Sequence, residues 1–153
     1  MKKLLLILLL SVSSAFANLG DTKDAAIKAY GQSIGSDKGL TAYHKGDWLI
    51  AEAYDDKGKC VICIYFKLFG AINDEDAATL DKENFPKNAR AEDLQEEKSY
   101  VPDCRVWASK DKSWGVVTGL IAFPVVGKLS ARAYVLSGPD TTKVLQQLSL
   151  PPL

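Results

Sequence analysis

Three cysteines and a single histidine are the side chains of this 153-residue chain that most readily take part in chemistry. Cys60 and Cys63 have the Cys-x-x-Cys spacing of redox-active pairs, which depend on a lowered thiol pKa such as a helix N-terminus provides. Here, however, the pair opens the run Cys-Val-Ile-Cys-Ile-Tyr-Phe, which is typical of a β-strand. Residues three apart in a regular strand point to opposite faces. We therefore expect the two sulfurs to lie apart, with a redox pair as the alternative.

The cysteines predict one disulfide, between Cys60 and Cys104. An odd number of cysteines in an oxidising compartment indicates one bridge and one remaining thiol. In the predicted strands Cys60 shares a side with Ile62, and Cys104 shares a side with Val106. This favours Cys60 as the partner of Cys104, with Cys63 as the alternative.

No catalytic or metal-binding pattern accompanies these residues. His44 could act as the base of a hydrolytic triad, but the chain has no Gly-x-Ser-x-Gly elbow and no other local nucleophile signature. Residues 73–76 supply oxygen ligands without the spacing of a calcium loop. Zinc needs three or four converging ligands, and sulfurs on opposite faces do not converge. We assign no catalytic residue, no metal and no cofactor.

Among the carboxylates on predicted strands, Glu52 has the most informative position. It lies mid-strand on the side of Trp48, Ile50 and Tyr54. A buried carboxylate there would need a partner such as Arg132, whereas a solvated one needs none. We expect Glu52 to be solvated.

Trp48, Tyr54 and Tyr65 are the candidate binding residues. They fall on neighbouring predicted strands and could line one exposed face of a sheet. Trp and Tyr often supply much of the binding energy at protein interfaces. The three side chains therefore predict a surface that binds a partner, and packing in the core is the alternative interpretation.

The elements that must position these side chains are predicted strands, interrupted midway by a polar helical segment. Apolar alternation and turn signals predict strands over residues 40–44, 48–54, 60–69, 104–108, 114–123 and 128–137. Helices are predicted near 22–30, within 73–98 and from 139 onwards. This order predicts an α+β fold, with helices packed on one face of an antiparallel sheet. An offset of 66 residues superposes Trp48 on Trp114 and suggests two similar halves, each of one helix and three strands.

The first 17 residues have the layout of a secretory signal peptide. A basic start precedes an apolar run, and Ala15-Phe16-Ala17 supplies the small residues of a cleavage site. We expect cleavage after Ala17, export to the periplasm or beyond, and a single domain over residues 18–153. An uncleaved membrane anchor is the alternative, although the apolar run 4–12 is shorter than the about 20 residues of a membrane span. We expect no membrane span after the leader is removed.

Charge narrows the range of partners. Lys2 and Lys3 leave with the leader, so 17 basic residues face 19 acidic ones and the net formal charge is −2. A surface that binds nucleic acid needs a clear basic excess. We therefore expect no nucleic-acid partner and predict another envelope or extracellular protein instead. The oligomeric state stays open.

One stretch of the chain resembles a known fold. A helix ending at Tyr30-Gly31, the strand Trp48-Leu-Ile-Ala, an Asp-Gly turn and an aromatic-rich strand follow one another over residues 22–69. This sequence of features resembles the fold of β-lactamase inhibitor proteins, which small outer-membrane assembly lipoproteins share, with a weaker echo over 88–137. In that fold a helical pair precedes a hairpin sheet. The chain lacks the lipid-attachment cysteine and a Pro after Gly31. The resemblance implies protein binding or envelope assembly, and it transfers no individual binding residue.

These observations predict a non-catalytic protein-binding module of the cell envelope. The sheet face or the hairpin loops at 55–59 and 110–113 would contact the partner. The alternatives are a small secreted hydrolase, which would use His44 or a pair of carboxylates, and a carrier of an apolar ligand. A carrier would require a dry cavity of a few hundred cubic ångström lined by Leu, Ile and Phe.

Overall fold

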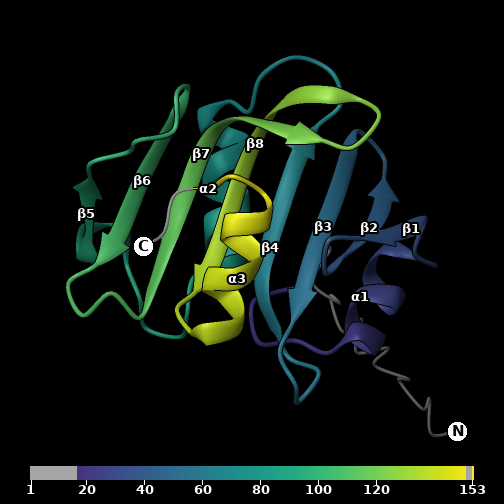
Figure 1. Cartoon of the computed structure of the whole chain (residues 1–153), viewed down its shortest axis with the longest axis horizontal. Helices are drawn as coiled ribbons and strands as arrows, with labels where there is room; N and C mark the ends of the chain where they lie inside the picture. The colour runs from purple at the N-terminus through teal and green to yellow at the C-terminus, as the bar shows by residue number, and fades with distance from the viewer. Residues whose placement is uncertain (1–16, 151–152) are drawn as a thin grey trace, which may run out of the picture.

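The computed structural model describes residues 17–150 and 153, and its centre is one eight-stranded antiparallel sheet (Figure 1). The strands are β1 (Gly35–Asp37), β2 (Leu40–Lys45), β3 (Trp48–Tyr54), β4 (Cys60–Lys67), β5 (Leu94–Glu97), β6 (Cys104–Ser109), β7 (Trp114–Phe123) and β8 (Gly127–Leu136). The helices are α1 (Lys23–Tyr30), α2 (Asp74–Asn84) and α3 (Pro139–Gln147), with a short 3-10 turn at η1 (Ala91–Asp93). The predicted α+β class with an antiparallel sheet is confirmed.

The strand order reveals two similar halves. The order is β1-β2-β3-β4-β8-β7-β6-β5, so each half forms a four-stranded meander and the last strands of the two halves pair with each other. One α-helix precedes each meander, and Trp48 and Trp114 begin the equivalent strands β3 and β7. Each half has one strand more than the sequence predicted. The additional strands β1 and β5 are short and polar (Gly-Ser-Asp and Leu-Gln-Glu-Glu), and they lack the apolar alternation that identifies a strand.

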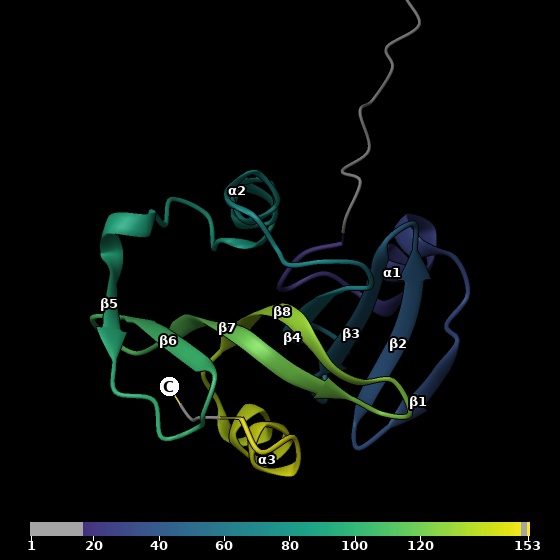
Figure 2. The ribbon, with the colours of Figure 1, turned by 90° about the horizontal axis from the view of Figure 1, so that it is seen from above.

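Helices cover both faces of the sheet. Figure 2 shows α1 and α2 on one face and α3 on the other. Alternation along β3 sends Leu49 and Ala51 to the side of α3 and Ile50 to the side of α1 and α2, into two separate core clusters. We call these sides the α3 face and the α1/α2 face. The helices were expected on one face, but the central strands are apolar on both sides and therefore need cover on both.

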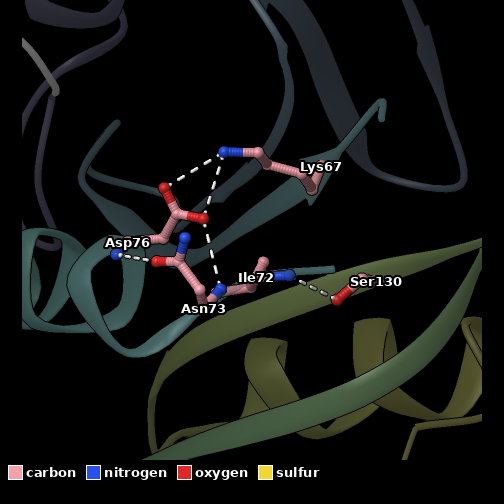
Figure 3. Close-up of polar contacts among 5 residues, drawn as sticks. All are labelled: Lys67, Ile72, Asn73, Asp76 and Ser130. Carbon is pink, nitrogen blue, oxygen red and sulfur yellow. Dashed lines mark hydrogen bonds and ion pairs between the residues drawn. The ribbon is translucent and has the colours of Figure 1, made fainter. Parts of the chain in front are cut away.

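The start of α2 is attached to the sheet by polar contacts (Figure 3). Asn73 and Asp76 form a reciprocal capping box, in which each side chain accepts from the other residue's backbone N–H. The Lys67 ammonium on β4 pairs with the Asp76 carboxylate at 3.1 Å, and the Ile72 N–H donates to the Ser130 hydroxyl on β8 at 3.0 Å. These contacts place α2 over the junction of the two halves.

A second contact holds the middle of α2. The Asp81 carboxylate accepts two hydrogen bonds from the Arg132 guanidinium, at 2.7 and 2.8 Å, and one from the Tyr134 hydroxyl at 2.6 Å. Both side chains are mostly buried: 23% of the Asp81 side chain and 15% of the Arg132 side chain are exposed. The α1/α2 face is thereby closed by charged contacts as well as by apolar packing.

In the part of the chain that the structure describes, no helix is both long and apolar enough to cross a membrane. The predicted leader falls on residues 1–17, of which 1–16 lie outside the described residues. Its last residue, Ala17, is described and is buried in the core.

Candidate functional site

The aromatic surface predicted from the sequence is absent, because α1 and α2 cover it. Trp48, Tyr54 and Tyr65 do share the α1/α2 face. Tyr65 has no exposed surface, and Trp48 and Tyr54 are partly buried. The Tyr65 ring packs edge-on against Trp48 and Tyr134, with ring centroids 6.3 and 6.1 Å apart. Tyr65 is a core residue, and Trp48 and Tyr54 pack against the same core cluster. Alternation decides which residues share a face but not which helix lies over it.

The predicted disulfide between Cys60 and Cys104 is wrong. All three cysteines are free and buried. Cys60 belongs to the core cluster of the α1/α2 face, and Cys104 belongs to the cluster of the α3 face. The sheet itself separates the two sulfurs. Cys63 lies on the same face as Cys60, so the alternative bridge from Cys63 to Cys104 is blocked in the same way.

A β-bulge brings Cys60 and Cys63 to one face. Tyr54 of β3 pairs with Cys60, whereas its neighbour Ala53 pairs with Ile62, so Val61 is an extra residue in β4. In a regular strand, residues three apart point to opposite faces. The extra residue shifts this alternation by one position, so Cys60 and Cys63 point to the same face. The expectation that the two sulfurs lie apart is therefore wrong, because nothing in the local sequence marked the bulge.

Glu52 completes this cluster and is fully buried. One carboxylate oxygen and the two sulfurs all lie within 4.8 Å of one another. The Cys63 thiol donates to Glu52 Oε1 at 3.6 Å, and the Tyr54 hydroxyl donates to Oε2. Tyr43 hydrogen-bonds to Tyr54 at 3.1 Å between hydroxyl oxygens and extends the chain of polar groups. Burial, only partly offset by these hydrogen bonds, raises the pKa of Glu52.

The expected solvation of Glu52 is therefore wrong, and so is its pairing with Arg132. Arg132 binds Asp81 on α2 instead. Within residues 17–150, no Lys or Arg forms an ion pair with Glu52. A carboxyl group in this position has only neutral hydrogen-bond donors around it.

A second set of polar side chains on this face forms hydrogen bonds with Ala17, the first described residue. The Tyr30 and Tyr65 hydroxyls each donate to the Ala17 carbonyl at 2.9 Å, and the Ala17 N–H donates to the Tyr30 oxygen at 2.8 Å. Asn84 of α2 joins Tyr65 through a hydrogen bond at 3.2 Å. The residue before the predicted cleavage site is thus bound to the helix and strand of the first half.

The structure assembles no hydrolytic site around His44. This histidine is exposed on β2, and no hydrogen bond or ion pair joins it to another side chain in the described part of the chain. A base in a triad needs a nucleophile and an orienting carboxylate within hydrogen-bond reach. In the described part of the chain, His44 is therefore not part of an assembled triad.

The α3 face contains an apolar cavity of about 300 Å³. It lies between the β1–β2 edge, the β7–β8 hairpin and the residue that ends α3, Leu148. Most of its wall is aliphatic or aromatic, including Leu40, Ala51, Ile64, Phe66 and Ile121. Ser36 and Asp37 are the polar residues at its lining, both on the exposed strand β1. The carrier alternative required a cavity of this size and chemistry.

Exposed apolar side chains border this cavity. Ile34 is 59% exposed and Val125, at the tip of the β7–β8 hairpin, is fully exposed; both contribute to the lining. Val125 also has a φ of 69°, a left-handed conformation that is costly for a β-branched residue. Strained residues of this kind often accompany functional surfaces. The turn 124–126 (Pro-Val-Val) is apolar where turns are normally polar, and this was the sequence signal that could have identified the site.

Comparisons with known proteins identify no family for the chain. No protein-family model and no curated protein matches it. Among solved structures, it is similar to the crystal structure of a DUF4309 family protein, YjgB, from Bacillus subtilis subsp. subtilis str. 168, with a TM-score of 0.42 and 13% sequence identity. The match covers 76% of this chain and 79% of that one.

This finding corrects the resemblance to β-lactamase inhibitor proteins. The similarity detected is to the DUF4309 protein instead. In addition, a single α-helix precedes the strands of each half, whereas the resemblance implied a helical pair. The motifs over residues 22–69 were too general to separate one α+β fold from another.

Proposed function

We propose that the protein is a non-catalytic binding protein that holds the apolar part of a small ligand in the cavity of the α3 face. One observation carries the proposal, namely the cavity of about 300 Å³ with walls of Ile64, Phe66 and Ile121. Small-molecule sites are concave and mostly apolar, with a few polar groups that orient the ligand, and typically have volumes of about 300–1,000 Å³. The cavity lies at the lower end of this range.

The lining defines the chemistry of the ligand. Its interior favours alkyl chains or rings, each buried methylene contributing about 0.8 kcal/mol. The Asp37 carboxylate and the Ser36 hydroxyl lie on the exposed edge strand and are suited to a polar or cationic end group. Affinity should therefore increase with alkyl chain length until the cavity is filled, and alkylammonium ligands should bind more tightly than alkyl carboxylates.

A binding titration with cavity variants tests this proposal. The neutral apolar fluorophore phenylnaphthylamine serves as the probe, and the alkyl compounds displace it. Ala42→Phe places a ring in the cavity, because Ala42 is a partly buried lining residue. Ala78→Phe is the matched control, because Ala78 is exposed on α2 at the opposite face. We expect one probe per chain and at least a tenfold loss of affinity in Ala42→Phe alone. Equal affinity of both folded variants would refute the proposal.

A second candidate function is the docking of another envelope protein on the border of the cavity. The observation that favours it is the exposure of Ile34 and Val125, which line the cavity, and of Val126, the next residue of the hairpin turn. Contiguous patches of large exposed apolar side chains are a common feature of protein interfaces. A photo-crosslinker at Val125 should then capture one reproducible partner in the native envelope, whereas the same group at Ala78 should not. Capture from both positions, or from neither, argues against docking.

Export is part of the same proposal and rests on the leader-like first 17 residues. N-terminal sequencing of protein from the periplasm or culture medium should begin at Asn18. Cleavage would remove Ala17, whose backbone is bound by Tyr30 and Tyr65. Protein that still carries Met1 in the cytosol would argue against export.

A further inference from the structure

Glu52, Cys60 and Cys63 are the one cluster in the described residues that has several potential metal ligands and is buried throughout. Their ligand atoms lie within 4.8 Å of one another, and each residue has at most 1% of its surface exposed. The cluster lies on the α1/α2 face, across the sheet from the apolar cavity. The proposed binding of an apolar ligand makes no use of it.

We propose that these three side chains form a zinc site. Cysteine sulfur and carboxylate oxygen are both ligand types that Zn²⁺ accepts, and this borderline-soft ion prefers tetrahedral coordination. Sulfurs bound to one tetrahedral zinc at about 2.3 Å lie about 3.8 Å apart. The ligand atoms of the cluster all lie within 4.8 Å of one another, so a small closing movement is enough to reach that separation. One coordination position remains for water.

The charge around Glu52 supports a cation at this place. The carboxyl group has no exposed surface, and within residues 17–150 no Lys or Arg forms an ion pair with it. A buried carboxyl group in such surroundings either takes up a proton or meets a cation, because an isolated buried charge is very costly. A divalent ion would offset two of the three negative charges that the carboxylate and the two thiolates carry when they bind it.

The surrounding hydrogen bonds orient the carboxylate as a ligand. The Tyr54 hydroxyl donates to Glu52 Oε2, and Tyr43 hydrogen-bonds to Tyr54. The other oxygen, Oε1, faces the Cys63 sulfur at 3.6 Å. Outer groups that hold one oxygen of a carboxylate fix the direction of the other in many metal sites. Tyr54 would act as such a positioning residue.

The β-bulge in β4 explains why the ligands converge. If Val61 were a regularly paired residue of β4 and not an extra one, Cys60 would point to the α3 face and the cluster would lose one sulfur. A bulge leaves part of the ladder unpaired and is common next to functional sites. Here its structural consequence is the approach of Cys60 to Cys63 and Glu52.

The first test uses the unmodified protein. The full mature chain, reduced and freed of metal with a chelator, is titrated with Co²⁺ and then with Zn²⁺. We expect a thiolate-to-cobalt charge-transfer band with the intensity of two thiolates, which one equivalent of zinc abolishes. Zinc binding should also release protons at neutral pH, because a thiol must lose its proton to become a zinc ligand.

Matched cysteine variants locate the site. Cys63→Ser should lower zinc affinity by more than about 100-fold, which exceeds the usual effect of losing an outer-sphere partner. Cys104→Ser is the control, because this buried cysteine lies on the opposite face. Tyr54→Phe should weaken binding by about 10-fold while leaving the cobalt band at two thiolates.

Three results would overturn the proposal. The first is the absence of a cobalt band in the reduced wild-type protein, which no folding defect of a variant can explain. The second is an equal loss of zinc affinity in Cys104→Ser and Cys63→Ser. The third is a quantitative disulfide between Cys60 and Cys63 in protein taken from the native envelope, since a disulfide removes both thiolate ligands.

Discussion

At the scale of single residues, the most informative group is the buried carboxyl group of Glu52. Its side chain shares a face with Tyr54, as the alternation of β3 requires, and α1 and α2 exclude water from that face. The hydroxyl of Tyr54 and the thiol of Cys63 replace the lost water as hydrogen-bond donors. Stability and metal binding therefore both depend on whether this one group carries a proton.

The pH dependence of stability follows from that burial. Burial raises the pKa of Glu52 above the value of about 4.3 that the unfolded chain would have. The folded protein therefore holds this proton at pH values where the unfolded chain has lost it. The stabilising contribution is full below the unfolded pKa and is lost as the pH rises through the folded pKa.

Glu52→Gln should remove this part of the pH dependence, because the amide cannot ionise. We expect the free energy of unfolding of the metal-free wild type to decrease more between roughly pH 4 and pH 8 than that of the variant. Urea titrations with a chelator present measure both curves. Parallel curves would show that Glu52 has the same pKa in the folded and unfolded states.

At the scale of elements, the position of α2 depends on a few charged contacts. Its first turn is capped by Asn73 and joined to β4 by Lys67, and its middle is bound to β8 through Asp81 and Arg132. The helix is polar overall and contributes few buried residues, Leu80 and Asn84. Charged contacts therefore contribute substantially, beside the apolar packing, to holding this helix on the sheet.

Asp81→Ala should lower the free energy of unfolding by about 2 kcal/mol, because it leaves the mostly buried Arg132 without its carboxylate. Glu96→Ala is the matched control. Glu96 forms a similar two-bond contact with Arg105, but both side chains are more than half exposed. Exposed pairs contribute little, so the control should remain within the error of the urea titration. Equal losses in both variants would contradict the role of burial.

A smaller effect is expected at the cap of α2. Asn73→Ala removes the side-chain acceptor for the Asp76 N–H and should cost about 1 kcal/mol. The hydrogen-exchange protection of α2 should decrease more than that of α3, whose N-cap residue Gly138 makes no side-chain hydrogen bond. Unchanged protection in α2 would indicate that tertiary contacts alone hold the helix.

At the scale of the whole molecule, the two halves form one continuous sheet through the pairing of β4 with β8. Both core clusters extend across this junction. The cluster on the α3 face includes Leu49 of β3 and Val106 of β6, and the opposite cluster includes Tyr30 of α1 and Val116 of β7. Neither half has a complete core by itself.

Thermal unfolding should therefore occur in a single cooperative transition. Calorimetry should give equal calorimetric and van't Hoff enthalpies, and fluorescence and circular dichroism should report the same midpoint. Two separate transitions would mean that the halves unfold independently despite their shared clusters. An apolar ligand bound in the cavity should raise the midpoint as its concentration increases.

Local patterns in the sequence determined the strands, the helices and the antiparallel α+β class. Alternation along β3, β4 and β7 and the Asp-Gly turn at 55–59 depend on neighbouring residues, so they can be recognised without the fold. The offset between Trp48 and Trp114 is also explained, because these residues begin equivalent strands. The short strands β1 and β5 were missed, since their polar residues pair only because a neighbouring strand is already in place.

The tertiary structure alone decided which faces are covered and which side chains meet. The bulge at Val61 turned Cys60 toward Cys63 and Glu52, and helices on both faces buried Tyr65 and separated Cys60 from Cys104. The apolar cavity likewise arises where the end of α3, the β1–β2 edge and the β7–β8 hairpin come together. Periodicity states on which side of a strand a residue lies. Contacts between segments far apart in the chain determine what occupies that side, and they depend on the packing of the whole molecule.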